Sequence, residues 1–426
     1  MARSGRRSAS LSALIAIIAI LLIASLGLAP TRTFVVATDS AVGNESLGMP
    51  GSQALIRDVF GKYMAVYVDA SGRLSIAYAN ADPATPGAWE TPVKSEAPPV
   101  PYARPAALLT SPWTLRILSE GGPMKGALVD TVVRVDRDLF GNIASFSFGP
   151  ATLVATSAQY VSATLAHDGS ILAVWNSVLP GQSSTVWALR WTAAGGWTSV
   201  ADPRSPMPDA VVVDSSDTEA IHPNIIERPD TLALYVVGNR GPESMMTTLV
   251  FNSAAFGGID WTWRTPNLAW ETNASRGFSD ATDLAWDPVR FVVVVTYDIT
   301  HTSRYGVIRL GASGAKEHLD TPSLELTNNE WGVLQVDASS GDYFLFAVNT
   351  QLAPPWGQEF GSVVYTRCTD GVWSRALTVL DNGTDDMAIS LRRPSMLEIG
   401  DGGSLELVYG KGTTAPATLM FVRLSP

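Results

Sequence analysis

The stretch Tyr63-Met-Ala-Val-Tyr-Val68 is a run of apolar and aromatic residues, and similar runs return along the chain. They are Ile171-Leu-Ala-Val-Trp175, Thr231-Leu-Ala-Leu-Tyr-Val-Val237 and Tyr343-Phe-Leu-Phe-Ala-Val348. An apolar run that often opens at a proline precedes each of them, and a third run with a Gly-Trp or Asp-Trp step often follows. A unit of about four strands that repeats every ~50 residues cannot bury its faces alone, and this pattern predicts a β-propeller.

Seven such units are expected, each with four strands counted from the centre of the ring outward. Their expected ranges are 52–96, 101–152, 157–203, 220–267, 279–322, 330–381 and 392–426. The seventh unit is one strand short, and residues 32–38 belong to no other unit. As the outer strand of that unit they would close the ring and cover an open sheet edge, although a plain linker strand is the alternative. The sequence thus predicts an all-β, seven-bladed β-propeller over residues 31–426.

The composition indicates a globular protein and excludes one class of partner. Of the 426 residues, 16% are charged and 46% are hydrophobic, so disorder is not expected. The net charge of −11 argues against a nucleic-acid partner, because phosphates require a basic surface. The single cysteine, Cys368, cannot form an intrachain disulfide, and its place in an alternating strand favours a buried, inert thiol.

The first thirty residues form a segment of a different kind. Arg3, Arg6 and Arg7 precede an apolar stretch at 11–29, which is long enough for a helix that spans a bilayer. A cleaved signal peptide, an uncleaved N-terminal membrane anchor and a buried core helix all remain open. The first two place the remainder outside the cytoplasm, secreted or anchored at the cell surface. Three glycosylation sequons in expected loops agree with this location, at Asn44, Asn273 and Asn382.

The chain resembles the sialidase-like, BNR-repeat propellers. The shared elements are the proline of the first strand, the Leu-Ala-Val-Trp run and the Gly-Trp step, seen at Gly87–Trp89, Gly195–Trp197 and Asp370–Trp373. The Asp-box of the family is present only in altered form. The resemblance implies a seven-bladed propeller, whereas sialidase activity would need three arginines, an Asp acid and a Tyr–Glu pair. The first family arginine lies in an Arg-Ile-Pro motif, which Tyr102-Ala-Arg104-Pro105 lacks, and the other groups match no motif of this chain.

Candidate binding residues follow from the alternation of strand directions. The connections between units and those between second and third strands share one face of a propeller, where most of its sites lie. Acidic residues come from the first kind of connection, and the second kind adds further polar and aromatic residues. The candidates are Asp217, Asp280, Asp283, His301, Arg304, Glu330, Trp356, Glu359 and Asp385.

Three roles are open for this group. Two of the carboxylates could act as general acid and base on a glycoside, several could bind Ca²⁺, or the face could contact a glycan or a protein. The plain alternative is that acidic loop residues cap turns and keep the protein soluble. No catalytic residue and no metal ligand can be assigned from a motif. Trp356, between prolines and a glycine in the long loop at 349–361, is the best single candidate for contact with a sugar or a partner.

The leading hypothesis is an extracytoplasmic propeller that acts in recognition or assembly, with a glycan or a protein at the cell surface as partner. A carbohydrate-active enzyme of the glycoside hydrolase class is the first alternative. The second is a filament or envelope subunit in which the segment at 11–29 packs against copies of itself. No cofactor is expected, apart from Ca²⁺ if the acidic residues converge.

Overall fold

The computed structural model describes the chain in segments. They are 32–48, 52–177, 185–197, 211–215, 219–230, 233–241, 248–256, 261–263, 269–272, 282–299, 304–321, 329–353, 358–374, 377–381, 389–391, 405–412 and 414–424. The apolar segment at 11–29 lies outside these residues. No helix within the described segments is long and apolar enough to cross a membrane.

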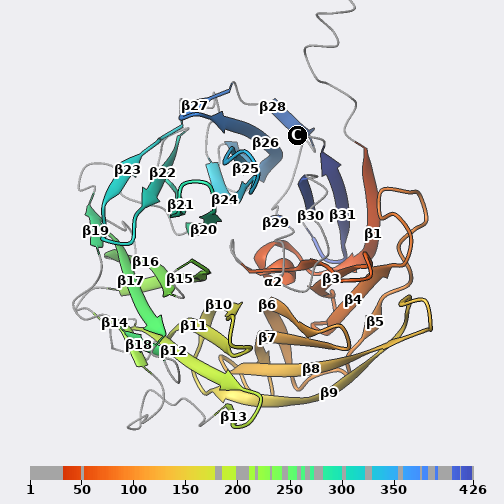
Figure 1. The fold of residues 1–426 in the computed structure, drawn as a ribbon. Coiled ribbons are helices and arrows are strands. Elements are labelled where there is room, and N and C mark those ends of the chain that lie inside the picture. Colours follow the sequence, from red (N-terminus) through yellow and green to blue (C-terminus); the bar gives the residue numbers. More distant parts are fainter. Residues whose placement is uncertain are drawn as a thin grey trace, which may run out of the picture.

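The strands form seven antiparallel sheets that stand in a ring, so the protein is an all-β propeller (Figure 1). The first two sheets contain β2 (Leu55–Arg57), β3 (Tyr63–Val68), β4 (Leu74–Ala79) and β5 (Val93–Lys94), then β6 (Val100–Ser111), β7 (Thr114–Gly122), β8 (Leu128–Arg137) and β9 (Ile143–Ala155). The third and fourth contain β10 (Gln159–Leu165), β11 (Ile171–Ser177), β12 (Thr185–Thr192), β13 (Gly196–Trp197) and β14 (Val211–Ser215), then β15 (Glu219–Arg228), β16 (Ala233–Gly241), β17 (Thr248–Phe256), β18 (Trp261–Trp263) and β19 (Ala269–Thr272).

The remaining sheets complete the ring. The fifth and sixth contain β20 (Thr282–Asp287), β21 (Val292–Asp298), β22 (Tyr305–Leu310) and β23 (Lys316–His318), then β24 (Asn329–Val336), β25 (Tyr343–Ala353), β26 (Gln358–Thr369), β27 (Val372–Trp373) and β28 (Leu377–Asp381). The last sheet has the order β1 (Thr33–Ser40), β31 (Ala417–Leu424), β30 (Leu405–Lys411) and β29 (Ile389–Leu391). Its outer strand therefore comes from the N-terminal side of the chain, with Thr33 opposite Val422 and Ala37 opposite Leu419.

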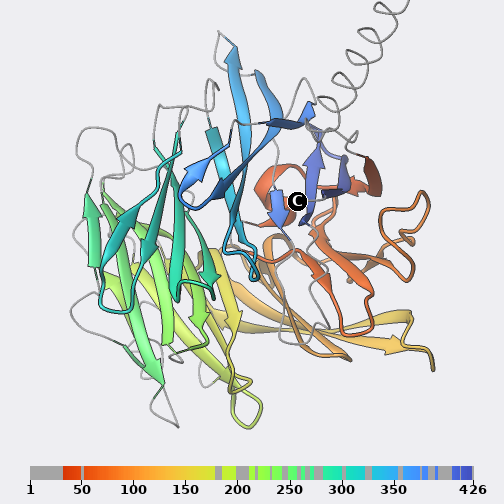
Figure 2. The same cartoon turned by 45° about the horizontal axis from the view of Figure 1, so that its top comes forward.

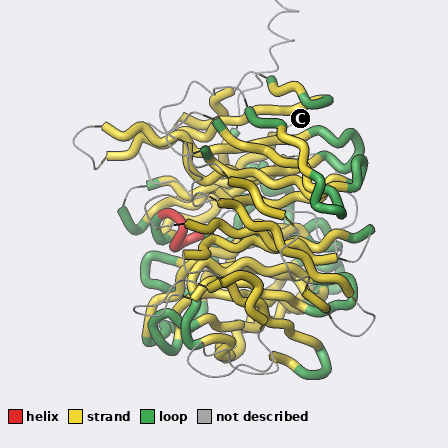
Figure 3. The backbone as a smooth tube through the Cα atoms, turned by 90° about the vertical axis from the view of Figure 1, so that its left-hand side faces the viewer, coloured by secondary structure: helices red, strands yellow, loops and turns green. Residues whose placement is uncertain are grey.

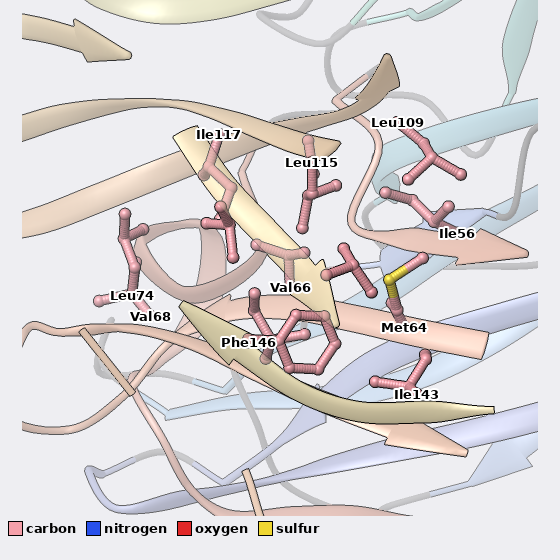
Figure 4. Packing of buried hydrophobic residues seen from close by; sticks show 14 residues of the cluster. Ile56, Met64, Val66, Val68, Leu74, Leu109, Leu115, Ile117, Ile143 and Phe146 are labelled. Carbon is pink, nitrogen blue, oxygen red and sulfur yellow. The ribbon is translucent and has the colours of Figure 1, made fainter. Parts of the chain in front are cut away.

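In the first and third sheets, neighbouring sheets cover both faces of the second strand. All residues of β3 and β11 are buried, which explains why these strands read as continuous apolar runs. Between the first two sheets, Met64 and Val66 pack against Ile117 and Phe146 (Figure 4). Burial of such side chains stabilises the fold by about 1.5–3 kcal/mol each, so the core is distributed around the ring.

The recurring Trp step joins neighbouring sheets, as expected for a packing device. Trp197 Nε1 donates to Asp130 Oδ2 of the preceding sheet (2.8 Å), and Trp373 Nε1 donates to the carbonyl of Leu319 (2.6 Å). The ring of Trp89 lies 5.7 Å from that of Phe421, across the junction of the first and last sheets. Each of these indoles therefore fixes one sheet to the sheet before it.

Three sheets have an outer strand in two pieces. Both β13 and β14 pair with β12, β18 and β19 with β17, and β27 and β28 with β26. The third and fourth sheets accordingly continue to Ser215 and Thr272, beyond the ends at 203 and 267 that the sequence predicts. The Trp step stands in the first piece, and after it the repeat pattern no longer indicates where the strand resumes.

The ring has two faces, which we name by their contents. The helix face carries α2 (Gly43–Leu47), the connections between sheets and those between second and third strands. An antiparallel bridge from Ser40 to Asp69 places the end of β1 on this face. The turn face carries the turns from first to second and from third to fourth strands. Figure 3 shows α2 on one side of the ring.

Candidate functional site

Four inner strands carry an irregularity at the same position on the helix face. The pairing register shifts between Ala103 and Ala106 in β6, and between Gln159 and Ser162 in β10. It shifts likewise within β15 and β24. Such bulges bend a strand and redirect a side chain, and they are frequent beside binding sites.

Two of these bulges hold residues in a conformation that L-residues rarely adopt. Arg104 has φ of +50° and Tyr160 has φ of +55°. Backbone strain of this kind costs about 1–3 kcal/mol and persists only where surrounding contacts fix it. Arg104 and Tyr160 stand at equivalent places in neighbouring sheets, which brings their side chains together.

Glu120, at the end of β7, connects the two strained residues. Its Oε2 accepts from Arg104 Nη1 (2.7 Å), and its Oε1 accepts from the Tyr160 N–H (2.8 Å). The guanidinium carbon of Arg104 lies 5.0 Å from the centroid of the Tyr160 ring. We call Arg104, Glu120 and Tyr160 the bulge cluster.

In the bulge cluster, the acidic side chain is buried and the basic side chain is partly exposed. The Glu120 side chain is 9% exposed, whereas that of Arg104 is 25% exposed. Burial raises the pKa of Glu120 above its usual value although Arg104 and the Tyr160 N–H lower it, and the nearby carboxylate of Glu45 in α2 raises it further. The cluster therefore presents a partly exposed arginine side chain whose charge is paired with a buried acid.

Tyr102 packs closely against two glycines next to the bulge cluster. A Cβ at Gly122 would lie 2.8 Å from the Tyr102 ring, and one at Gly121 would lie 2.1 Å from the Pro101 carbonyl oxygen. Gly121 has φ of +90° and Gly122 has φ of +77°, so the end of β7 needs glycine at both positions. The result is an aromatic and polar patch on the helix face next to α2.

Five residues that the sequence nominates lie outside the described segments. They are Asp217, Asp280, His301, Trp356 and Asp385. Their role in binding stays a prediction, and so does the Ca²⁺ site that would need several of them. Within the described segments, no group of three or more His, Cys, Asp or Glu side chains could hold a metal ion.

Asp283 is part of the interior and not of an open rim. It lies in β20 with no exposed surface. Its Oδ1 accepts from the Leu284 N–H and its Oδ2 from the Leu334 N–H of the next inner strand, both at 2.8 Å. Asn224 Nδ2 also donates to it (3.4 Å), and Asn224 Oδ1 accepts from Ser162 Oγ (2.9 Å). Polar side chains thus link four successive inner strands, and Asp283 serves this link.

The three remaining predicted residues, Arg304, Glu330 and Glu359, lie in or next to strands. Arg304 is exposed and precedes β22, and its Nε donates to the Thr321 carbonyl (3.1 Å). Glu330 lies in β24 opposite Val348, and Glu359 lies in β26 opposite Leu352. The expected long loop at 349–361 is mostly a hairpin, because β25 and β26 stay paired out to Ala353 and Gln358, and its blue strands extend beyond the ring in Figure 2.

The sequon at Asn44 is in α2 and not in a loop as expected, and the side chain of its Ser46 is buried. Asn273 and Asn382 lie outside the described segments. Glycosylation at the three positions stays a prediction.

Two acidic residues in turns cap those turns, as the alternative to a binding role predicts. Asp58 Oδ1 accepts from the N–H groups of Phe60 (2.9 Å) and Lys62 (2.8 Å). Asp138 Oδ1 accepts in the same way from Phe140 (2.8 Å) and Asn142 (2.9 Å). These carboxylates close turns of the turn face.

Sequence reasoning did not predict any of the three residues of the bulge cluster as members of a site. Arg104 could be found through its proline, which marks the first strand of a unit, and Tyr160 stands at the same place in the next unit. Glu120 carries no motif, because a lone acid at the end of a strand is indistinguishable from a solvated one. Only the pairing of β6 with β7 brings it beneath Arg104.

Comparison with known proteins supports the fold and not a family. No protein-family model and no curated protein sequence matches the chain. Among solved structures, an ulvan lyase of a polysaccharide lyase family is similar, with a TM-score of 0.62 at 12% identity over 91% of this chain and 95% of that one. Trypanosoma rangeli sialidase has a TM-score of 0.46 at 12% identity, over 93% of this chain and 60% of that one. At such identities the likeness to the lyase shows a shared propeller fold alone.

Proposed function

We propose that this protein is an extracytoplasmic β-propeller that binds a glycan at the bulge cluster of its helix face. The observation that carries the proposal is the Arg104 side chain, which is 25% exposed and is held over Tyr160 by a strained bulge and a buried acid. Strain that is fixed by surrounding contacts is characteristic of binding sites. A guanidinium offers several N–H donors in a fixed plane, and an aromatic ring offers a surface for a sugar ring.

A neutral glycan fits the site better than an acidic polysaccharide. Glu120 already balances the charge of Arg104, and the whole chain carries a net charge of −11. A polyanion would therefore meet repulsion at long range without a free cation at the site. Sugar hydroxyls can accept from Arg104 without any such cost.

The finer architecture belongs to the same proposal. We infer that each sheet is one blade, so that the ring has seven blades and is closed by β1, and that the units are altered BNR repeats. We also propose that the segment at 11–29 is an N-terminal membrane anchor, which would hold the propeller at the cell surface. A cleaved signal peptide and a filament subunit are its alternatives.

A carbohydrate-active enzyme on the same site is the second candidate. One observation favours it: Glu120 has a raised pKa, and Glu45 is close enough to raise it. A carboxyl group with a raised pKa can act as a general acid on a glycoside when a second carboxylate is near. Against it, both oxygens of Glu120 already accept hydrogen bonds within the protein.

A glycan array followed by calorimetry tests the proposal. The purified chain should bind neutral oligosaccharides, and Arg104→Met should weaken that binding at least tenfold, about 1.4 kcal/mol. Arg134→Met is the matched control, since its side chain is 78% exposed and it pairs with Thr114, at the opposite end of β7 from Glu120. Binding that is equal in wild type and Arg104→Met would contradict the site. Hydrolysis of the bound glycan that Glu120→Gln abolishes would favour the enzyme.

A further inference from the structure

Exposed apolar side chains gather on the turn face of the ring. In the described part of the chain, nine large apolar side chains are exposed, and seven of them lie in or beside turns of this face. Leu139 and Phe140 are 100% and 85% exposed in the turn between β8 and β9. Exposed apolar groups of this kind mark sites of interaction when they cluster.

Four of these side chains form one cluster across the first two sheets. Phe60 and Trp113 come from the first turns of their sheets, with ring centroids 6.2 Å apart. The turn that presents Leu139 and Phe140 lies against Phe60, because a Cβ on Gly141 would lie 2.6 Å from the Phe60 ring. We call Phe60, Trp113, Leu139 and Phe140 the turn-face cluster.

A buried arginine holds the three turns in place. Arg137 Nη2 pairs with Asp58 Oδ2 (2.6 Å), and neither side chain is exposed. Its Nε donates to the Pro112 carbonyl (2.8 Å) and its Nη1 to the Gly141 carbonyl (2.9 Å). The exposed aromatics are therefore mounted on a fixed base and not on loose loops.

The first described strand of the chain, β1, begins at the turn face. Thr33 pairs with Val422 at the turn-face end of the last sheet, and that sheet adjoins the first through the hydrogen bond from Tyr63 to Glu406 (2.9 Å). Three residues separate the apolar segment at 11–29 from Thr33, so the four Cα–Cα steps between residue 29 and Thr33 span at most about 14 Å. If that segment is in a bilayer, the turn face is the side of the propeller nearest to it.

We propose that the turn face docks on the lipid bilayer that the N-terminal segment spans, with the turn-face cluster in the interfacial layer. This inference rests on the anchor of the proposed function. Trp and Phe side chains with apolar neighbours favour the headgroup region of a membrane. The acidic chain fits a neutral, zwitterionic surface better than an anionic one. The helix face, with the bulge cluster, would then point away from the membrane.

Two single-cysteine forms of the full chain test the docking. Both carry Cys368→Ala, which removes the buried thiol. One form adds Phe140→Cys on the turn face. The other adds Met124→Cys on the helix face, where Met124 is 43% exposed in the turn between β7 and β8. Each is labelled with an environment-sensitive fluorophore and reconstituted in phosphatidylcholine nanodiscs with and without spin-labelled lipid. Melting curves confirm that both forms fold as the wild type does.

We expect the label at 140 to shift to the blue and to be quenched by the spin-labelled lipid several-fold more than the label at 124. Equal, weak quenching at both positions, in protein that remains in the nanodiscs, would overturn the docking and leave the anchor intact. Protein that does not stay in the nanodiscs would overturn both. A blue shift at 140 that grows with protein concentration and needs no lipid would assign the face to a second copy of the chain and overturn the proposal.

Discussion

Buried acids in this protein differ in what satisfies them. Asp58 pairs with a buried arginine, Asp283 accepts backbone N–H groups of two inner strands, and Glu120 combines one arginine with one backbone N–H. An ionised carboxylate away from water is costly unless such partners are present. The first two acids have a structural role, whereas Glu120 supports a side chain that reaches the surface.

Glu120 should make stability depend on pH. Its folded pKa is raised by burial above the ordinary 4.5, so the folded protein binds this proton more tightly than the unfolded chain does. The stability that Glu120 contributes is present below about pH 4.5 and is lost as pH rises through the folded pKa. We therefore expect the melting temperature of Glu120→Gln to rise relative to wild type as the pH increases above 4.5. Glu317→Gln, at a side chain 59% exposed, is the control. A difference that is constant over this range would contradict the argument.

Arg137 should be among the most sensitive positions of the chain. Removal of one partner from a fully buried ion pair costs about 3–5 kcal/mol, because the other charge is left without compensation. We expect Arg137→Met to lose free energy of unfolding of this size, measured by urea denaturation. Arg134→Met, which breaks the exposed pair with Asp136, should lose about 0–1 kcal/mol. Equal losses in the two variants would be inconsistent with a buried pair.

The strands could be predicted where the chain is apolar on both faces. The runs at Tyr63–Val68 and Ile171–Ser177 are second strands, and their apolar character follows from burial on either side. The outer strands are half-covered and carry a weaker pattern, so the pieces Val211–Ser215 and Ala269–Thr272 escaped prediction. The hairpin of β25 and β26 was interpreted as a loop because its prolines and glycines outweigh the pairing that flanks them.

The pairing of β1 with β31 predicts a difference between two truncations. Loss of residues 1–30 leaves β1 in place, whereas loss of residues 1–40 exposes the edge of β31, and an open edge promotes association. We expect the shorter truncation to melt as the full chain does, and the longer one to melt lower and to associate in sedimentation experiments. Two truncations that are equally stable and both monomeric would show that β1 does not close the ring.

The link between inner strands gives a second test at this scale. Asp283→Ala leaves the N–H groups of Leu284 and Leu334 without acceptors, each at a cost of about 1–3 kcal/mol. We expect a lower free energy of unfolding with unchanged glycan affinity in the folded fraction. Glu317→Ala, at a side chain that is 59% exposed, is the control and should change neither quantity by more than about 1 kcal/mol. A normal stability together with lost binding would return Asp283 to the binding site.

At the scale of the whole molecule, the two faces of the ring differ in their backbone features and in their exposed side chains. The helix face carries strained bulges with polar side chains, and the turn face carries capped turns with exposed apolar tips. The alternation of strand directions follows from the repeat, so the sequence predicts which connections share a face; that this face binds a ligand stays a prediction. The sequence could not select the residues, since Arg104, Glu120 and Tyr160 come from three strands whose register sets their meeting. One of the acids that the sequence places on this face, Asp283, lies in the interior.

The central claim is that the bulge cluster binds a glycan. Its most direct test is calorimetry, in which a neutral oligosaccharide chosen from the array is titrated into wild type and into Arg104→Met. The bulge cluster as the binding site predicts saturable binding to wild type and at least a tenfold weaker affinity in the variant, with a melting curve that shows the variant folded. Equal affinities in two folded proteins would contradict the claim and place the binding elsewhere on the propeller.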